Sequence, residues 1–232
     1  MDRRKMAIVG WTLIWGGLLT FGYLGWQLLG TDVLNARVQA EAAETLDRHL
    51  EVAAEEPPVV VEVVEEEAEG EEGFQVEHFQ EAIPAEDVGF ARLSVPSLDL
   101  EAVMFEGVST VTLTKGPGHM PGTPLPGQPG NSVISGHRTT YGRPFYDLDL
   151  LGPGDRIEVE TSIGLHVYEV RESFVVAPTD VWVTDDKPGA WLTLTTCHPR
   201  FSARERLIVT AELVEGPNFD YVQFLDRLPA PA

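Results

Sequence analysis

The sequence predicts a mainly β fold for its larger C-terminal part, preceded by a single transmembrane helix and an acidic linker. Three features predict this: an uncharged apolar run near the start, a glutamate-rich tract after it, and short apolar segments separated by Gly and Pro from about Gly89 onward. The chain has 232 residues, of which 37 are acidic and 16 basic, for a formal net charge of −21. So large an acidic excess argues against a nucleic-acid-binding protein.

The apolar run, residues 7–29, holds 23 uncharged residues, and as a helix it would span about 35 Å, enough to cross a bilayer. Trp11 and Trp26 lie near its ends, where indole rings favour the membrane interface. Three basic residues precede it within residues 1–6, so the positive-inside rule predicts a cytoplasmic N-terminus and an extracellular remainder. The alternative is a cleaved signal peptide, although the apolar run is longer than a signal core and residues 38–40 are a weak cleavage site.

Residues 30–88 are expected to form an acidic, largely disordered stalk. Residues 41–88 contain seventeen acidic residues and one basic residue, Arg48. Mutual repulsion of these charges favours an extended, solvated spacer, although its first part could form a fraying helix. The alternative reading is a docking surface for a basic partner.

Residues 89–232 are long enough for one folded domain with its own core. Segments rich in Val, Ile, Leu and Thr predict strands over Phe90–Val95, Leu98–Phe105, Ser132–Ser135, Arg156–Thr161, His166–Val176, Trp191–Cys197 and Leu207–Leu213, with helical turns over Ser109–Lys115 and Pro144–Leu150. Between them, the Gly- and Pro-rich segment Lys115–Asn131 predicts a structured loop. It lacks the Gly-Lys-Ser/Thr sequence of a phosphate-binding loop.

The single cysteine, Cys197, lies at the end of a predicted strand. Alternation along Trp191–Cys197 places Leu192 and Leu194 on one face and the cysteine on the other. Pro199 follows closely and cannot extend the ladder, so the thiol is expected where a loop can open a cleft. With one cysteine the chain forms no internal disulfide, and any thiol chemistry belongs to Cys197.

Two further polar residues occur at strand ends. His137 follows the predicted strand Ser132–Ser135 and is a candidate acid or base, because an imidazole beside a cysteine promotes thiolate formation and later protonates a leaving amine. Arg206 directly precedes the strand Leu207–Leu213, and its fixed positive charge could stabilise the oxyanion of a tetrahedral intermediate.

The local sequences around these residues resemble the sortase family. Thr193–Cys197 reads TLTTC, and an arginine that opens an apolar strand follows nine residues later. The segments GHRTTYGRPF (136–145) and KGPGHMPGTPLPGQPGN (115–131) look like those of class E, actinobacterial housekeeping-type sortases. The resemblance covers about 89–214 and implies that 89–232 is a sortase catalytic domain, a closed β-barrel with short helices.

Carried over by position, the resemblance implies that Cys197 is the nucleophile, His137 the general acid/base and Arg206 the residue that stabilises the oxyanion. It also implies substrate-binding roles for Thr196, Tyr141 and Met120. Arg204 is rejected as the catalytic arginine, because relatives place theirs directly before the apolar strand. His119 and His198 are rivals to His137 that lack its sequence context.

The resemblance implies a membrane-anchored cysteine transpeptidase that cleaves an LAXTG/LPXTG-like C-terminal sorting motif between Thr and Gly through a Cys thioester. The expected partners are exported proteins bearing such a signal, the amine of a peptidoglycan precursor or of a pilin lysine, and the membrane, with no nucleic acid. No cofactor is expected, although the loop residues Asp180, Asp185 and Asp186 could supply oxygens to calcium.

Three alternatives stay open at this point. One is an L,D-transpeptidase-like cysteine acyltransferase, whose own signature is not found in the sequence. Another is a membrane-anchored binding domain without turnover, against which the intact Cys197, His137 and Arg206 argue. The third is a zinc site from His119, His137, Cys197 and His198, which lack paired ligand spacing.

Overall fold

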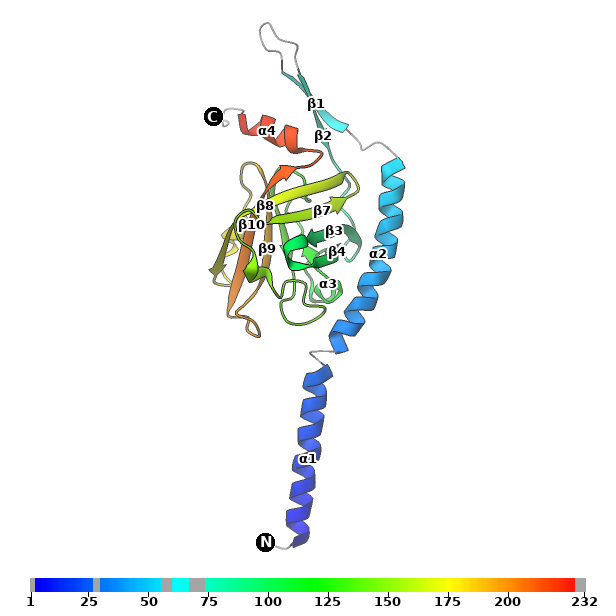
Figure 1. Ribbon diagram of the computed structural model, residues 1–232, viewed down its shortest axis with the longest axis vertical. Coiled ribbons are helices and arrows are strands. Elements are labelled where there is room, and N and C mark those ends of the chain that lie inside the picture. The colour runs from blue at the N-terminus through cyan, green and yellow to red at the C-terminus, as the bar shows by residue number, and fades with distance from the viewer. Residues whose placement is uncertain (1–2, 27–29, 56–59, 67–73, 228–232) are drawn as a thin grey trace.

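A computed structural model describes residues 3–26, 30–55, 60–66 and 74–227. The core of the molecule is a closed β-barrel, with one long helix running along its side and another projecting away from it (Figure 1). Around the barrel the strand order is β10-β8-β7-β3-β4-β5-β6-β9, and β9 pairs with β10 to close it. The predicted mainly β class, as a closed barrel with short helices, is therefore confirmed.

The barrel strands lie close to the segments that the sequence predicts. They are β3 (Gly89–Val95), β4 (Leu100–Glu106), β5 (Gly118–His119), β6 (Gly130–Ser135), β7 (Arg156–Thr161), β8 (Gly164–Val176), β9 (Ala190–His198) and β10 (Glu205–Glu215). β4 begins at Leu100 rather than at Leu98, because Pro96–Leu98 forms a 3₁₀ turn (η2) that ends on Asp99 in the left-handed region, with φ 51°. The short β5 was not predicted and lies inside the Gly/Pro-rich loop.

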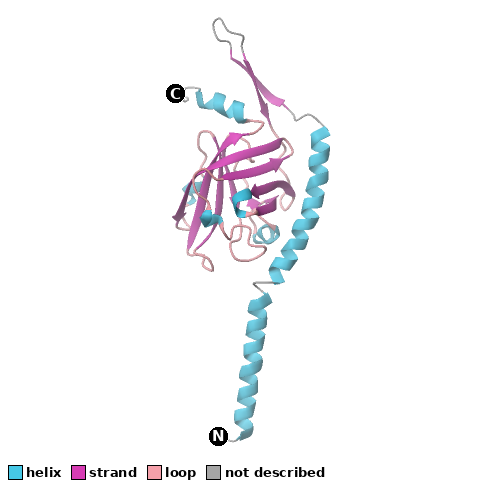
Figure 2. Cartoon of the chain, in the orientation of Figure 1, coloured by secondary structure: helices cyan, strands magenta, loops and turns pink. Residues whose placement is uncertain are grey.

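Short helices occupy the connections and the C-terminal end (Figure 2). At α3 (Thr110–Lys115) the Ser109 side chain accepts a hydrogen bond from the Thr112 N–H, which caps the helix. The 3₁₀ turns η3 (Leu148–Leu150) and η4 (Val181–Thr184) lie in the loops before β7 and β9. The C-terminal helix α4 (Phe219–Arg227) was not predicted.

The helix α1 (Arg3–Gly25) has the properties of a membrane span. It has 23 residues, none of them buried, and it is the one helix among the described residues that is long and apolar enough to cross a bilayer. The Thr12 and Thr20 hydroxyls donate to the carbonyls of Ile8 and Gly16, at 2.9 and 2.8 Å, so these polar groups are satisfied within the helix.

The structure differs from the expected disordered stalk over 30–88. Residues Thr31–Glu55 form one continuous helix, α2, which packs on the barrel through Leu46 against Val103 and Phe105. Its glutamates (Glu41, Glu44, Glu51 and Glu55) are all exposed. The net charge of the tract hides this amphipathic arrangement, because the glutamates lie on the solvent side of a helix whose other side is packed.

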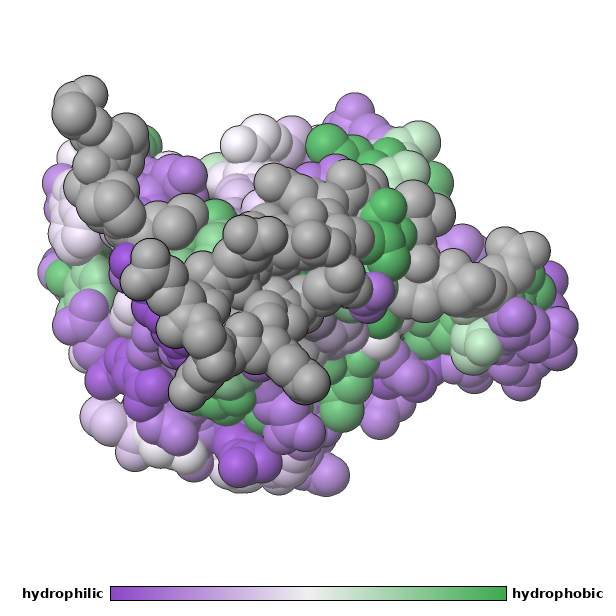
Figure 3. All heavy atoms as spheres, turned by 90° about the horizontal axis from the view of Figure 1, so that it is seen from above, coloured by the Kyte–Doolittle hydropathy of each residue, from purple (hydrophilic) through white to green (hydrophobic). Residues whose placement is uncertain are grey.

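The second half of the expected stalk also contains ordered elements. The strands β1 (Val60–Glu66) and β2 (Phe74–Phe79) pair in a two-stranded antiparallel sheet. His78 stacks on Tyr221 of α4 with ring centroids 4.1 Å apart, and its Nε2 lies 2.9 Å from the Gln128 amide oxygen. On this end of the molecule, opposite α1, the described residues form a face on which hydrophilic residues alternate with several hydrophobic patches (Figure 3).

One core histidine makes stability depend on pH. His166 is fully buried on β8, and burial lowers its pKa to about 4, below the value of about 6.5 for an exposed histidine. Since the unfolded chain takes up this proton more readily, the stability contributed by neutral His166 is present above about pH 6.5 and is lost as the pH falls towards 4.

We expect this loss to reach about 3 kcal/mol at the acidic end. The measurement is the free energy of unfolding of the full chain in detergent, at several pH values between 7 and 4, for the wild type and for His166→Leu. The variant should lose less stability over this range than the wild type. Equal losses in the two proteins would show that another group causes the acid sensitivity.

Candidate active site

Cys197 lies between two strands whose ends carry the other predicted site residues. On one side, the antiparallel register of β9 and β10 pairs Cys197 directly with Arg206. On the other, β6 runs parallel to β9 with Ser135 paired to Thr195, and the Gly136 N–H continues the ladder by donating to the Thr195 carbonyl at 3.1 Å. Extending that register by two residues places His137 beside Cys197. The barrel thus sets Cys197 beside Arg206 of β10 and next to the segment after β6 that carries His137.

The local sequence of β9 explains why the thiol faces outward. Ala190, Leu192 and Leu194 belong to the buried core, and Thr196 continues this inward series at 3% exposure. Cys197, the next residue, therefore points to the opposite face, where it is half-buried. Alternation in the sequence predicted this placement of Cys197.

Thr196 links the cysteine strand to the histidine segment. Its hydroxyl donates to the Gly136 carbonyl at 2.7 Å, directly before His137. Gly136 has no room for a side chain, because a Cβ there would lie 2.6 Å from the Phe145 ring. Thr196 of TLTTC and Gly136 of GHRTTYG thus fix the distance between the end of β9 and the segment that follows β6.

His137 is half-buried and has a free ring nitrogen. Its Nε2 is buried and makes no hydrogen bond to the described residues, and its ring lies 5.0 Å, centroid to centroid, from that of Tyr141. Burial lowers the pKa of His137, because an imidazolium loses solvation there. An unpaired nitrogen beside a thiol can accept a proton from it and later donate one to a leaving group.

Arg206 brings a positive charge to the other side of the thiol. Its Nη1 donates to the carbonyls of Ala203 and Glu205, at 3.0 and 2.9 Å, and no carboxylate of the described residues lies within ion-pair distance of its guanidinium. Arg204 lies outside β10 and is exposed. The register therefore places Arg206, rather than Arg204, opposite Cys197.

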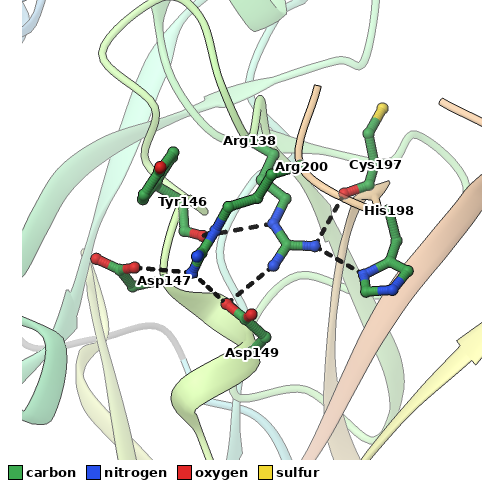
Figure 4. A network of polar contacts seen from close by, with 7 residues as sticks. All are labelled: Arg138, Tyr146, Asp147, Asp149, Cys197, His198 and Arg200. Atoms are coloured by element: carbon green, nitrogen blue, oxygen red, sulfur yellow. Dashed lines mark hydrogen bonds and ion pairs between the residues drawn. The ribbon is translucent and has the colours of Figure 1, made fainter. Parts of the chain in front are cut away.

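Behind the site lies a buried polar network that the sequence reasoning missed (Figure 4). Arg138 is 2% exposed, and its Nη1 donates to the Cys197 carbonyl at 3.3 Å and to His198 Nδ1 at 2.8 Å. Its Nη2 pairs with Asp149 at 2.9 Å, and Asp149 also binds Arg200 at 2.8 Å. The network holds the end of β9 in place. The sequence does carry a signal for this network, because an arginine directly follows His137. Consecutive side chains of an extended segment point to opposite sides, so Arg138 points to the inner side.

The same network argues against His198 as the general acid/base. Arginine has only donors, so the His198 Nδ1 that faces Arg138 must act as an acceptor. His119, the other rival, is 1% exposed, with Nδ1 2.6 Å from Glu106 Oε2 and Nε2 3.0 Å from the Pro124 carbonyl. Both of its nitrogens are occupied in a structural role beside β5.

The predicted substrate-binding residues fall in different places. Tyr141 packs on His137 and lies at the site. Thr196 lies there too, but its buried hydroxyl is engaged by Gly136. Met120 hydrogen-bonds through its N–H to the Val133 carbonyl, and Val133 pairs with Thr193, four residues or about 13 Å along β9 from Cys197.

The described residues contain no group of three or more His, Cys, Asp or Glu side chains arranged to hold a metal ion. Asp180 accepts from the Ala177 N–H at 2.8 Å, and Asp186 accepts from the N–H groups of Asn131 and Lys187 at 3.1 Å. These carboxylates organise the loop before β9. The calcium and zinc alternatives therefore gain no support from the geometry.

Comparison with known proteins identifies the family. The sortase domain model matches residues 93–214. Sortase SrtE1 of Streptomyces coelicolor is 38% identical over 143 residues, which is 55% of this chain and 41% of that relative, so this chain spans less than half of its length. The crystal structure of Sortase E1 from Streptomyces coelicolor with a tripeptide in the active site is 35% identical, with a TM-score of 0.53 over 56% of this chain and 92% of that one.

A second solved structure adds a ligand of known kind. Clostridium perfringens sortase C, with the C-terminal cell wall sorting motif, is 29% identical, with a TM-score of 0.54 over 57% of this chain and 74% of that one. The family match extends over more than half of the chain and includes Cys197, His137 and Arg206. This protein belongs to the sortase family, whose members are cysteine transpeptidases.

Proposed function

We propose that this protein is a membrane-anchored cysteine transpeptidase in which Cys197 is the nucleophile, His137 the general acid/base and Arg206 the oxyanion-stabilising residue. One observation carries the proposal: the barrel register sets Cys197 between Arg206 on β10 and the segment of His137 after β6. A nucleophile, a proton carrier and a fixed cation in one place are what acyl transfer through a thioester requires.

The reaction follows from these positions. His137 takes the proton of the Cys197 thiol, and the thiolate attacks a peptide carbonyl, whose oxygen becomes negative beside Arg206. The carbon–nitrogen bond then breaks as His137 returns the proton to the departing amine, which leaves a thioester on Cys197. A second amine then attacks the thioester and gives up a proton to His137. The Cys197 thiolate leaves and takes that proton, so the new amide forms with no net change in the protein.

The proposed substrates are exported proteins with a C-terminal sorting motif cleaved between Thr and Gly, and the proposed acceptor is an amine of a cell-wall precursor or a pilin lysine. The sorting motif bound to Clostridium perfringens sortase C supports the substrate class. The face that carries Cys197 also supports it, because Phe174 of β8 and Trp182 stack there with centroids 5.8 Å apart. This apolar surface lies on the same sheet face as the nucleophile, two strands across from it, and it suits the side chains of an extended peptide.

The direct test uses the full chain in detergent micelles, incubated with a peptide containing LAXTG or LPXTG and a small amine. We expect a product in which the amine replaces the glycine end of the peptide, detected by its mass, together with a transient adduct on Cys197. Binding of the peptide with no cleavage over the same period would instead favour a non-catalytic binding domain.

The class E resemblance makes a prediction on motif choice. An LAXTG peptide should have a higher kcat/KM than the matched LPXTG peptide, because proline lacks the N–H that a site reading the second backbone position would bind. An acceptor left unpaired costs about 1–3 kcal/mol, which corresponds to roughly a ten- to hundredfold difference. Equal use of both peptides, or a preference for proline, would refute this specificity without touching the transpeptidase chemistry.

We also propose that α1 anchors the protein with its N-terminus in the cytoplasm and the barrel outside the cell. The basic residues Arg3, Arg4 and Lys5 in the first turn of α1, and the apolar, unburied surface of the rest of the helix, support this orientation. Protease added to intact cells should therefore digest the barrel, as followed with an antibody against its C-terminal end. Protection of the barrel until the cells are lysed would contradict the orientation.

A further inference from the structure

The first turn of α2 contacts the loop that follows the active-site histidine. Asp32 Oδ1 accepts a hydrogen bond from the Gly142 N–H at 2.9 Å, and Asp32 Oδ2 pairs with the Arg143 Nε at 3.1 Å. One turn further along, the Asn35 amide donates to the carbonyls of Thr114 and Lys115, both at 2.9 Å. These contacts join the helix that follows the membrane span to a segment five residues beyond His137.

Two barrel glycines leave space for this helix. A Cβ on Gly142 would lie 2.1 Å from Asn35 Oδ1, and a Cβ on Gly116 would lie 2.2 Å from Gln39 Nε2. Gln39 also exchanges hydrogen bonds with the Val103 backbone, at 2.8 and 3.1 Å. The barrel surface is thus shaped to receive the amide side chains of α2 at close range.

The contacted loop has an unusual backbone. Tyr141, Gly142 and Arg143 are three consecutive residues with positive φ, at 53°, 77° and 51°. Only glycine adopts this region without strain, so the conformation of Tyr141 and Arg143 must be held by their surroundings. Asp32 binds two of the three residues, the Gly142 backbone and the Arg143 side chain.

The third residue of this turn touches the proposed acid/base. The Tyr141 ring lies 5.0 Å from the His137 ring, at a tilt of 37°. Tyr141 therefore forms one wall around the imidazole and helps to keep water from it. The position of that wall depends on the turn that Asp32 holds.

We propose that Asp32 is a positioning residue, which holds the left-handed turn of Tyr141–Arg143 so that Tyr141 stays against His137. The inference rests on the proposed role of His137 in catalysis. The hydrogen bond and the ion pair of Asp32 go to Gly142 and Arg143 rather than to Cys197 or His137, so its effect is transmitted through the turn. Through Asp32, the helix α2, which follows the membrane anchor, becomes part of the support of the active site.

The same helix offers a matched control. Asp47, also an acidic residue of α2, pairs with Arg92 of the barrel. Arg92 is on β3. In the barrel order, β4, β5 and β6 lie between β3 and β9, the strand that carries Cys197. Loss of either aspartate removes one ion pair between α2 and the barrel, but only Asp32 contacts the turn beside His137.

The experiment compares Asp32→Ala, Asp32→Asn and Asp47→Ala in the full chain in detergent micelles. The first readout is kcat and KM for thioester formation with a sorting-motif peptide. We expect Asp32→Ala to lower kcat about tenfold with little change in KM, because a displaced acid/base slows chemistry and leaves the peptide surface intact. Asp32→Asn retains an oxygen for the Gly142 N–H and should lose less, whereas Asp47→Ala should match the wild type.

The second readout is the titration of the labelled His137 ring by NMR, which needs no turnover. Because burial lowers the pKa of His137, release of the turn should admit water and raise that pKa towards its ordinary value. The titratable and charged groups around this ring are Arg138 next to it in the chain, Tyr141, Cys197 and Arg206, and all three variants keep them.

Each outcome supports or overturns the positioning role. A raised pKa in Asp32→Ala, with Asp47→Ala unchanged, supports it even if no peptide is turned over, in which case the proposed function fails alone. Unchanged titration and kcat in Asp32→Ala, or equal changes in both alanine variants, overturns it. Should Asp32→Ala fail to fold, Asp32→Asn against Asp47→Ala decides in the same way.

Discussion

Replacement of Cys197 by alanine is expected to abolish the acyl-enzyme and all transpeptidation. Cys197 is the single cysteine of the chain, so no other thiol can take over the attack on the peptide carbonyl. The measurement is the intact mass of the protein after incubation with a sorting-motif peptide. The wild type should show a mass increase equal to the acyl part of the peptide, and the variant should show none.

The fold should survive this change, which makes the loss interpretable. The Cys197 backbone pairs with Arg206, and its carbonyl accepts from Arg138, contacts that alanine retains. We therefore expect a circular dichroism spectrum and a melting temperature close to those of the wild type. A folded alanine variant that still forms the amide product would show that the reaction does not pass through Cys197.

Replacement of Arg206 by alanine is expected to lower kcat/KM by on the order of 10²-fold or more, with His137→Ala in the same range. In the register Arg206 is the cross-strand partner of Cys197, and no described carboxylate neutralises its charge. Its loss leaves the developing oxyanion without that cation, so the fall should be seen in the rate of thioester formation, measured by rapid quench and mass.

Arg204→Ala is the matched control for that measurement. Arg204 has the same side chain two residues away, is exposed, and lies before the start of β10. It should retain nearly the wild-type rate. Loss of activity in Arg204→Ala with near-normal turnover in Arg206→Ala would reverse the assignment of the arginine.

Much of the barrel was predictable because its signals are local. Strand positions follow from short apolar runs broken by Gly and Pro, and the outward direction of Cys197 follows from alternation along the six residues before it. The three proposed catalytic residues are recognisable for the same reason, since each lies at the end of an apolar strand in a distinctive short sequence. The signal for α1, the candidate membrane span, is equally local, because it is one uncharged run of sufficient length.

The docking of α2 shows the limit of that reasoning. Asn35 and Gln39 bind barrel carbonyls more than sixty residues away in the chain, and hydropathy marks both as solvent-exposed. The net charge of residues 41–88 suggested repulsion and disorder, yet charge summed along a segment carries no information on which side of a helix it lies. The hydrogen bonds that hold α2 exist only once the barrel has formed its surface.

The roles of buried polar groups were equally hard to predict from the sequence. Arg138 beneath Cys197, and His119 beside Glu106, look in the sequence like surface or catalytic candidates, but in the fold they are satisfied structural residues. Whether a polar side chain reacts or supports depends on whether its donors and acceptors already have partners. Local sequence determines which chemical groups lie at the strand ends. Long-range packing determines which of them have partners: His137 Nε2 has none among the described residues, whereas both ring nitrogens of His119 are occupied.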